Sequence, residues 1–273
     1  MKRVHRYNIM TARKPTVLLT NDDGIRAPGL KHLWNSLKDH CDIYIFAPAT
    51  EQSGVGAAVS LRAPLHVTEF PWENQTPAWQ ITGTPADCVR MGTSVVLQKP
   101  VDLILSGINK GANSGRNIFF SGTVGGVIDG AMRGIPGIAF SCEDYDSPNY
   151  EYFEPHIFSL VQYILDHPLE LGTFLNVNFP SSYKKEHKGY RWARQGLGYY
   201  REQPQHGKHP DGGSYYWMGG QWAESLEHEE SDVHLLKQGF MTVVPVQVQE
   251  LTDMTAFQGR KEHFQQSLTT VTY

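Results

Sequence analysis

The stretch from Val17 to Ile25 most constrains the fold, because four residues of buried-strand character lead directly into Asn21-Asp22-Asp23-Gly24. In an open α/β sheet, ligands bind beyond the carboxyl ends of the strands, so side chains at that end are available for chemistry. The stretch therefore predicts a strand that delivers two carboxylates to an active-site edge. Taken alone, the same run could equally be a polar turn that caps the next helix.

The adjacent carboxylates of Asp22 and Asp23 point to a cation. In a pocket of low dielectric constant they repel each other strongly unless a proton or a cation lies between them. Oxygen ligands of this kind suit Mg²⁺, Mn²⁺ or Ca²⁺ rather than zinc. A bound divalent metal ion is the simplest way to offset this repulsion.

The pattern of a short strand followed by a polar, glycine-containing segment recurs twice. Residues 42–47 have strand character and lead into Pro48 to Gly56, where Ser53 offers a hydroxyl and the glycines let the backbone approach a ligand. By itself this segment is more simply a plain loop. Residues 102–105 lead into 106–115, which contains three glycines, two serines and two asparagines, so we expect a loop throughout 106–115.

Helical patterns separate these strands. Apolar residues at helical spacing predict a crossover helix over 29–39, and Thr84 followed by Pro85 predicts a helix over 84–96. We expect Asp87 to support that helix start rather than chemistry. Residues 121–131 predict a helix that opens with exposed amides behind small residues, a geometry that binds phosphate. Strand character returns at 137–141 and 174–179, with a helix over 153–166 between them.

Residues 65–70 and 79–82 predict a hairpin.

The C-terminal third has a different pattern. Residues 186–232 are rich in aromatic and turn residues. A zinc site formed by histidines is an alternative that we do not favour, because the spacing matches no known ligand frame; the histidines concerned are His206, His209, His228 and His234. We expect a strand over 240–248 and a polar tail after it.

Composition restricts the partners and the compartment. A net charge of -4 leaves no basic surface for polymeric nucleic acid. Three widely spaced cysteines indicate a reducing compartment rather than a disulfide framework. Residues 1–15 lack the apolar run of a secretory signal and no stretch reaches transmembrane length, so we expect a flexible tail, no membrane association and a cytoplasmic protein.

With these motifs in order, the chain closely resembles the SurE family of metal-dependent nucleotidases; the motifs are Asn21-Asp22-Asp23-Gly24, the Ser53 loop, Gly83 to Cys88, Ser106-Gly107-Ile108-Asn109 and Ser121-Gly122-Thr123-Val124-Gly125. The resemblance implies an α/β, Rossmann-like three-layer core over 16–185. It also implies a smaller C-terminal hairpin and oligomerisation region over 186–273, with strand 240–248 returning to the core.

The resemblance also implies the chemistry. It implies one Mg²⁺ or Mn²⁺ per subunit, held by Asp22, Asp23, Ser53 and Asn109, and hydrolysis of nucleoside 5'- and 3'-monophosphates, with polyphosphate as a further substrate. Ser121, Gly122 and Thr123 would contact the phosphate, together with Asn21. Asp22 or Asp23 would take the proton of the attacking water, although an aspartyl-phosphate stays an alternative.

Two other classes of function compete with hydrolysis. The chain could be a metal and nucleotide sensor without turnover, or a structural subunit whose glycines serve packing alone; polar loops at three successive strand ends argue against the latter. Eight aromatic residues exceed what a loop-rich region can bury, which predicts a homodimer or homotetramer through the C-terminal segment, or base stacking within one subunit. They are Tyr190, Trp192, Tyr199, Tyr200, Tyr215, Tyr216, Trp217 and Trp222.

Overall fold

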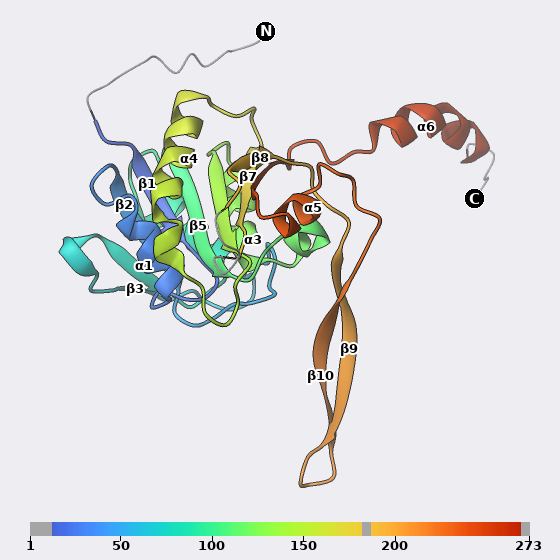
Figure 1. Cartoon of the computed structure of the whole chain (residues 1–273), viewed down its shortest axis with the longest axis horizontal. Helices are drawn as coiled ribbons and strands as arrows, with labels where there is room; N and C mark the ends of the chain where they lie inside the picture. Colours follow the sequence, from blue (N-terminus) through green and yellow to red (C-terminus); the bar gives the residue numbers. More distant parts are fainter. Residues whose placement is uncertain (1–12, 182–186, 269–273) are drawn as a thin grey trace.

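A nine-stranded sheet forms the centre of the molecule in the computed structural model, which describes residues 13–181 and 187–268 (Figure 1). The strand order is β3-β4-β2-β1-β5-β6-β7-β11-β8. Most of the tail predicted over 1–15 lies outside the described residues.

Parallel pairing dominates the sheet. The parallel strands, in spatial order, are β4 (Ala78–Ile81), β2 (Asp42–Pro48), β1 (Thr16–Thr20), β5 (Leu103–Lys110), β6 (Gly137–Cys142) and β7 (Thr173–Phe179). The antiparallel β3 (Val67–Glu69) pairs with β4 as the predicted hairpin. The predicted strand near the C-terminus is confirmed as β11 (Met241–Gln247), which runs antiparallel to β7 and parallel to the short β8 (Tyr190–Trp192).

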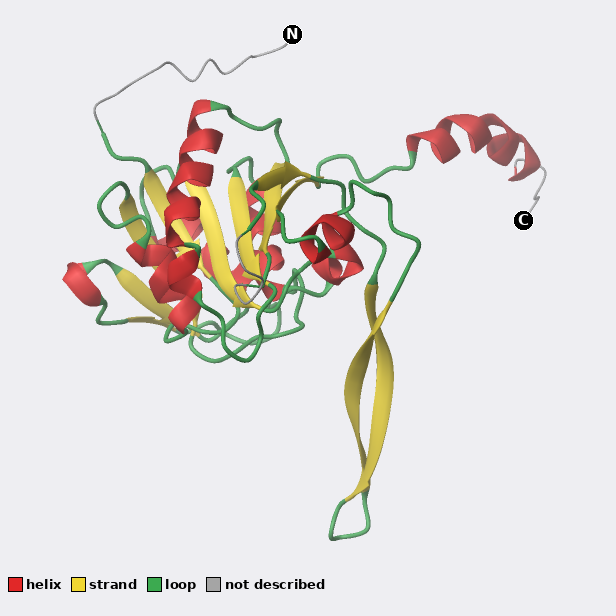
Figure 2. Ribbon diagram, in the orientation of Figure 1, coloured by secondary structure: helices red, strands yellow, loops and turns green. Residues whose placement is uncertain are grey.

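Helices cover both faces of the sheet, which gives the predicted three layers (Figure 2). One face carries α1 (Pro28–Asn35) and α4 (Glu154–Asp166), and the other carries α2 (Pro85–Met91) and α3 (Gly122–Met132). Because side chains alternate across a strand, Leu19 packs under the first pair of helices and Leu18 under the second. Burial on both faces explains the continuous apolar run of β1.

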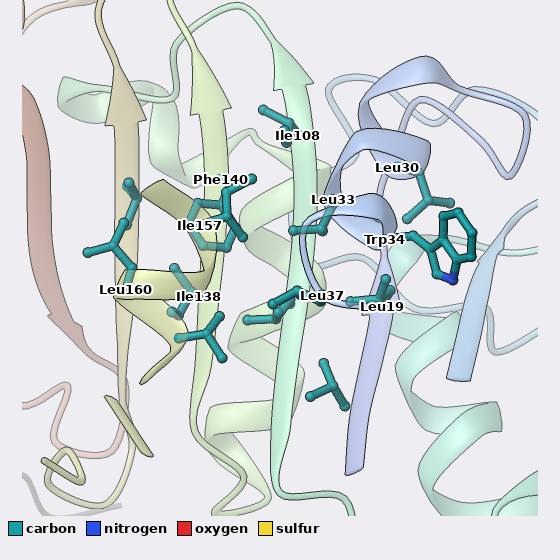
Figure 3. Packing of buried hydrophobic residues seen from close by; sticks show 14 of the residues in the cluster. Leu19, Leu30, Leu33, Trp34, Leu37, Ile108, Ile138, Phe140, Ile157 and Leu160 are labelled. Atoms are coloured by element: carbon teal, nitrogen blue, oxygen red, sulfur yellow. The ribbon is translucent and has the colours of Figure 1, made fainter. Parts of the chain in front are cut away.

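The core beneath α1 and α4 is made of large apolar side chains (Figure 3). Leu30, Leu33 and Trp34 of α1 face the sheet, and Ile157 and Leu160 of α4 continue the same layer. This packing holds the first strand rigidly, so the residues that follow it start from a fixed position.

Short helical segments connect the larger elements: η1 (Glu73–Gln75), η2 (Gly92–Val96), η3 (Gly115–Phe119), η4 (Tyr150–Tyr152) and α5 (Asp232–Lys237). Thr84 and Asp87 form a reciprocal capping box at the start of α2, and Asp87 also accepts hydrogen bonds from Ser60. The prediction that Asp87 supports the helix start is therefore confirmed.

The prediction of a loop throughout 106–115 is wrong for its first half. Strand β5 continues to Lys110, and its pairing with β6 skips a step between Ser106 and Asn109. Ile108 within this bulge is buried in the core, so the segment does contribute an apolar side chain. The polar composition hid this because glycine and asparagine favour turns as well as bulges.

Two elements extend from the body of the molecule (Figure 1). Strands β9 (Tyr199–Lys208) and β10 (Ser214–Ala223) form a separate two-stranded antiparallel ribbon. The predicted polar tail contains a helix that the sequence pattern did not predict, α6 (Met254–Leu268), whose side chains are all exposed. Within the described part of the chain, no helix is long and apolar enough to cross a membrane.

Candidate active site

Asp22 lies at the carboxyl end of β1 and is buried. Its Oδ1 accepts a hydrogen bond from the Thr123 hydroxyl, and the backbone of Thr123 also bonds to it. Burial raises the pKa of Asp22 above its ordinary value, and the bonds from Thr123 oppose this rise. The start of α3 thus holds one carboxylate of the pair.

Asp23 faces β5 instead. The Nζ of Lys110 lies 3.9 Å from its Oδ1, and the Lys110 backbone also bonds to this carboxylate. Burial, and then the charge of Asp22, raise the pKa of Asp23 to about 6, while Lys110 lowers it. A cation between two neighbouring carboxylates would favour the charged form of both.

The start of α3 packs directly against Asp22. Ser121 caps the helix by accepting the amide of Val124 at 3.2 Å. A Cβ on Gly122 would lie 2.8 Å from the Cβ of Asp22 and 3.1 Å from the carbonyl oxygen of Gln52. Glycine at this position therefore lets the helix N-terminus, where anions bind, approach the carboxylates closely.

A second close approach joins α3 to the Ser53 segment. A Cβ on Gly125 would lie 2.1 Å from the carbonyl oxygen of Gly56, and the amide of Gln52 donates to the carbonyl of Asp22 at 2.7 Å. Gly122 and Gly125 thus serve close packing, which offsets the cost of glycine within a helix.

The remaining predicted ligands differ in their orientation. The Asn109 amide nitrogen donates to the carbonyl oxygens of Lys110 and Gly111, at 3.2 and 2.9 Å, which leaves its Oδ1 for another partner. Ser53 is exposed, and its hydroxyl donates to Glu51 Oε1 at 2.7 Å. The structure therefore brings Asp22, Asp23 and Asn109 to one edge, whereas the Ser53 hydroxyl is turned toward Glu51.

Asn21 supports the turn that follows β1. Its Nδ2 donates to the carbonyl oxygen of Gly24 at 2.9 Å, and Gly24 has a φ of +99°. The Oδ1 of Asn21 is buried and has no hydrogen-bond partner among the described residues. A buried acceptor without a partner fits a site that receives a further polar group.

The donor set fits a hard cation. Carboxylate, amide and hydroxyl oxygens are the ligands that Mg²⁺ and Mn²⁺ accept. Residues 13–181 and 187–268 contain no cluster of three or more His, Cys, Asp or Glu side chains that could hold a metal. The predicted set has only two such residues, so it depends on Ser53 and Asn109 for its remaining protein ligands.

Lys110 and Glu51 are site residues that the sequence analysis missed. Lys110 Nζ lies 4.0 Å from Glu51 Oε2 and 3.9 Å from Asp23 Oδ1. The ammonium group of Lys110 therefore links the segment after β2 to the segment after β1. The position of Lys110 immediately after Asn109 was the available signal. The position alone does not show that the Lys110 side chain approaches Asp23 and Glu51, because those contacts join segments far apart in the sequence.

Comparison with known proteins gives consistent matches. The family model described as Survival protein SurE matches residues 17–202. The protein "5'-nucleotidase SurE" of Protochlamydia amoebophila is 49% identical over 242 residues, covering 88% of this chain and 93% of the relative. Another protein of that name, from Caldanaerobacter subterraneus, is 39% identical over 246 residues, covering 89% of this chain and 95% of the relative.

A solved structure agrees with these matches. The crystal structure described as Sure Protein from Aquifex aeolicus has a TM-score of 0.77 and 33% sequence identity, and the match covers 92% of this chain and 100% of that chain. The likeness therefore extends over the sheet and most of the C-terminal region.

Proposed function

Because the chain belongs to the SurE family, we propose that it is a 5'-nucleotidase that hydrolyses nucleoside monophosphates to nucleoside and inorganic phosphate. One observation carries this proposal: the buried carboxylate of Asp22 accepts its hydrogen bonds from Thr123, at the start of α3. Cation ligands and a helix N-terminus that attracts anions therefore adjoin each other. Phosphoryl transfer to water needs both features in one place.

One divalent cation, Mg²⁺ or Mn²⁺, would be held by Asp22, Asp23 and Asn109, with Ser53 joining after its hydroxyl turns from Glu51. When bound, such a cation polarises a phosphate oxygen and lowers the pKa of a coordinated water. The ammonium group of Lys110 partly balances the charge of Asp23. Asp22 or Asp23 would take the proton of the attacking water.

The phosphate would lie against the start of α3. Ser121 and the amide of Gly122 face the anion in this proposal, and Asn21 contributes its polar side chain. The hydroxyl of Thr123 donates to Asp22, so its first role is to position that carboxylate; the predicted phosphate contact of Thr123 stays a prediction. Backbone amides do not read the base, so both purine and pyrimidine monophosphates are expected substrates, with the phosphate on either the 5' or the 3' position.

Phosphate release across a panel of nucleotides tests the proposal. Nucleoside 5'-monophosphates, 3'-monophosphates and short polyphosphate are assayed with Mn²⁺, with Mg²⁺ and after exhaustive chelation. We expect metal-dependent release from the 5'-monophosphates, and further release from 3'-monophosphates and polyphosphate. Binding of nucleotide and metal without turnover would identify a sensor instead. Full activity after chelation would refute the role of the cation.

The assembly proposed is a homodimer or homotetramer through residues 186–273. The ribbon exposes Tyr216, Trp217 and Met218 to solvent, which is more apolar surface than an isolated two-stranded ribbon can bury. Light scattering at micromolar concentration tests this, and a fully active monomer would refute it.

We also place the protein in the cytoplasm, a compartment compatible with its three buried free cysteines.

A further inference from the structure

Two adjacent phenylalanines lie in solvent immediately before the start of α3, where the phosphate is proposed to bind. Phe119 is 74% exposed and Phe120 is 64% exposed, and Phe120 immediately precedes the helix cap Ser121. Single exposed apolar residues are ordinary, but two successive rings beside a catalytic helix form a concentrated apolar surface.

The backbone beneath these rings is held from three sides. The amide of Gly56 donates to the carbonyl of Phe120 at 3.0 Å, and the amide of Phe120 donates to the carbonyl of Asn117 at 3.0 Å. The neighbouring Ile118 is buried and packs against α3. The rings therefore project from a fixed support rather than from a mobile loop.

The base of the ribbon also supports this segment. The amide of Arg116 donates to the carbonyl of Gly198 at 2.8 Å, and the amide of Tyr200 donates to Asn117 Oδ1 at 3.2 Å. The segment before α3 is thus fixed by both the Ser53 loop and the start of β9. Pre-organised groups of this kind bind a ligand with little loss of conformational entropy.

We propose that Phe119 and Phe120 form the surface on which the nucleoside part of a nucleoside monophosphate packs when its phosphate lies at the start of α3. This inference rests on the proposed function. Phenylalanine rings have no hydrogen-bonding group, so they stack on the face of any base without reading its hydrogen-bonding edge, and a purine offers the larger face. The contact is made in the ground state as well as in the transition state, so it should affect KM more than kcat.

Another exposed ring near the site is already engaged. Tyr145 lies beside Lys110, whose Nζ is 5.4 Å from the centre of its ring, and this places Tyr145 on the Asp23 side of the site. A base on that side would compete with a lysine for the ring. The two phenylalanines have no such neighbour among the described residues that the structure records as a ring contact or cation–π pair.

Steady-state kinetics of Phe119→Ala and Phe120→Ala test the proposal. The substrates are a purine nucleoside 5'-monophosphate, a pyrimidine nucleoside 5'-monophosphate and ribose 5-phosphate, which has no base. At least one variant should raise KM for the nucleotides by roughly 5-fold to 100-fold, more for the purine, with KM for ribose 5-phosphate unchanged. Phe119→Trp and Phe120→Trp should keep the wild-type KM values, because the ring is retained.

Matched controls separate stacking from other effects. Tyr163 on α4 is 48% exposed and lies outside both the site and the proposed assembly region, so Tyr163→Ala should leave every KM unchanged. A rise in nucleotide KM in Tyr145→Ala, without one in the phenylalanine variants, would place the base on the opposite side and overturn the proposal.

Three further results would also overturn it. KM could rise equally for ribose 5-phosphate, the variants could behave as wild type, or light scattering could show that they change the oligomeric state, which would assign the rings to a subunit contact. If the wild-type protein releases no phosphate from nucleotides, the proposed function fails and this inference fails with it. Wild-type turnover with unchanged KM in the variants overturns the stacking surface alone.

Discussion

Replacing Gly122 by alanine should lower kcat/KM while changing the stability of the fold less. The added carbon would lie 2.8 Å from the Cβ of Asp22, about 0.6 Å inside the 3.4 Å at which ordinary contact begins. It would also lie 3.0 Å from the Oδ2 of Asp22. The substitution therefore pushes a carboxylate whose position is otherwise fixed by Thr123.

The expected magnitude follows from that displacement. A misplacement of about 1 Å in an active site costs on the order of 10²-fold, so a shift of a few tenths of an ångström should lower kcat/KM by roughly 4-fold to 20-fold. Stability should change less. Alanine in place of glycine favours a helix by about 0.5–1 kcal/mol, whereas overpacking costs about 1–3 kcal/mol, and these effects oppose each other.

The assay combines initial rates of phosphate release with urea unfolding of the same protein. Gly259→Ala in α6 is the matched control, because no atom lies within 4 Å of its added carbon. It should leave kcat/KM unchanged while stabilising α6. Retention of wild-type kcat/KM in Gly122→Ala would refute the reasoning, because it would show that the contact with Asp22 does not position a catalytic group.

Substitutions at three other positions test the site and its support. Thr123→Val removes the hydroxyl bonded to Asp22, a bond worth about 1.5–3 kcal/mol, so kcat/KM should fall at least 10-fold for every nucleotide and Thr123→Ser should restore it; a loss confined to one base would contradict this. Asp23→Asn should abolish turnover while the protein stays folded. The pKa of Asp23 is raised from 3.8 to about 6, so ionisation of this group destabilises the folded state as pH rises through that interval. In thermal melts of chelated protein, Asp23→Asn should therefore lose less stability over that interval than wild type. Parallel stability profiles of the two proteins would contradict the raised pKa. Thr84→Ala removes a helix cap and should cost about 1 kcal/mol in urea unfolding with kcat unchanged, and lost activity would reveal a second role.

Local patterns predicted most of the core. The apolar run before Asn21 gave β1, and Ser121 followed by small residues gave the start of α3, because strand burial and helix capping both depend on neighbours in sequence. The two carboxylates and Asn109 could be assigned to one edge because parallel strands end together.

The errors arose where distant contacts decide the structure. The continuation of β5 to Lys110 depends on pairing with β6 and on burial of Ile108, which composition does not reveal. The pairing of Lys110 with Asp23 and Glu51 depends in turn on that continuation. The helix α6 has no buried face, so apolar periodicity gave no signal for it.

The protruding ribbon links folding to protein concentration. A two-stranded ribbon that packs only against itself is at best marginally stable in water, so β9 and β10 gain most of their free energy from whatever covers them. If a second copy of the chain covers the ribbon, the fraction of molecules with an ordered ribbon increases with protein concentration by mass action. The stability of the nine-stranded sheet does not depend on concentration in this way. Because Gly198 and Tyr200 at the base of the ribbon bond to the segment before α3, dilution should loosen one wall of the site before it unfolds the sheet.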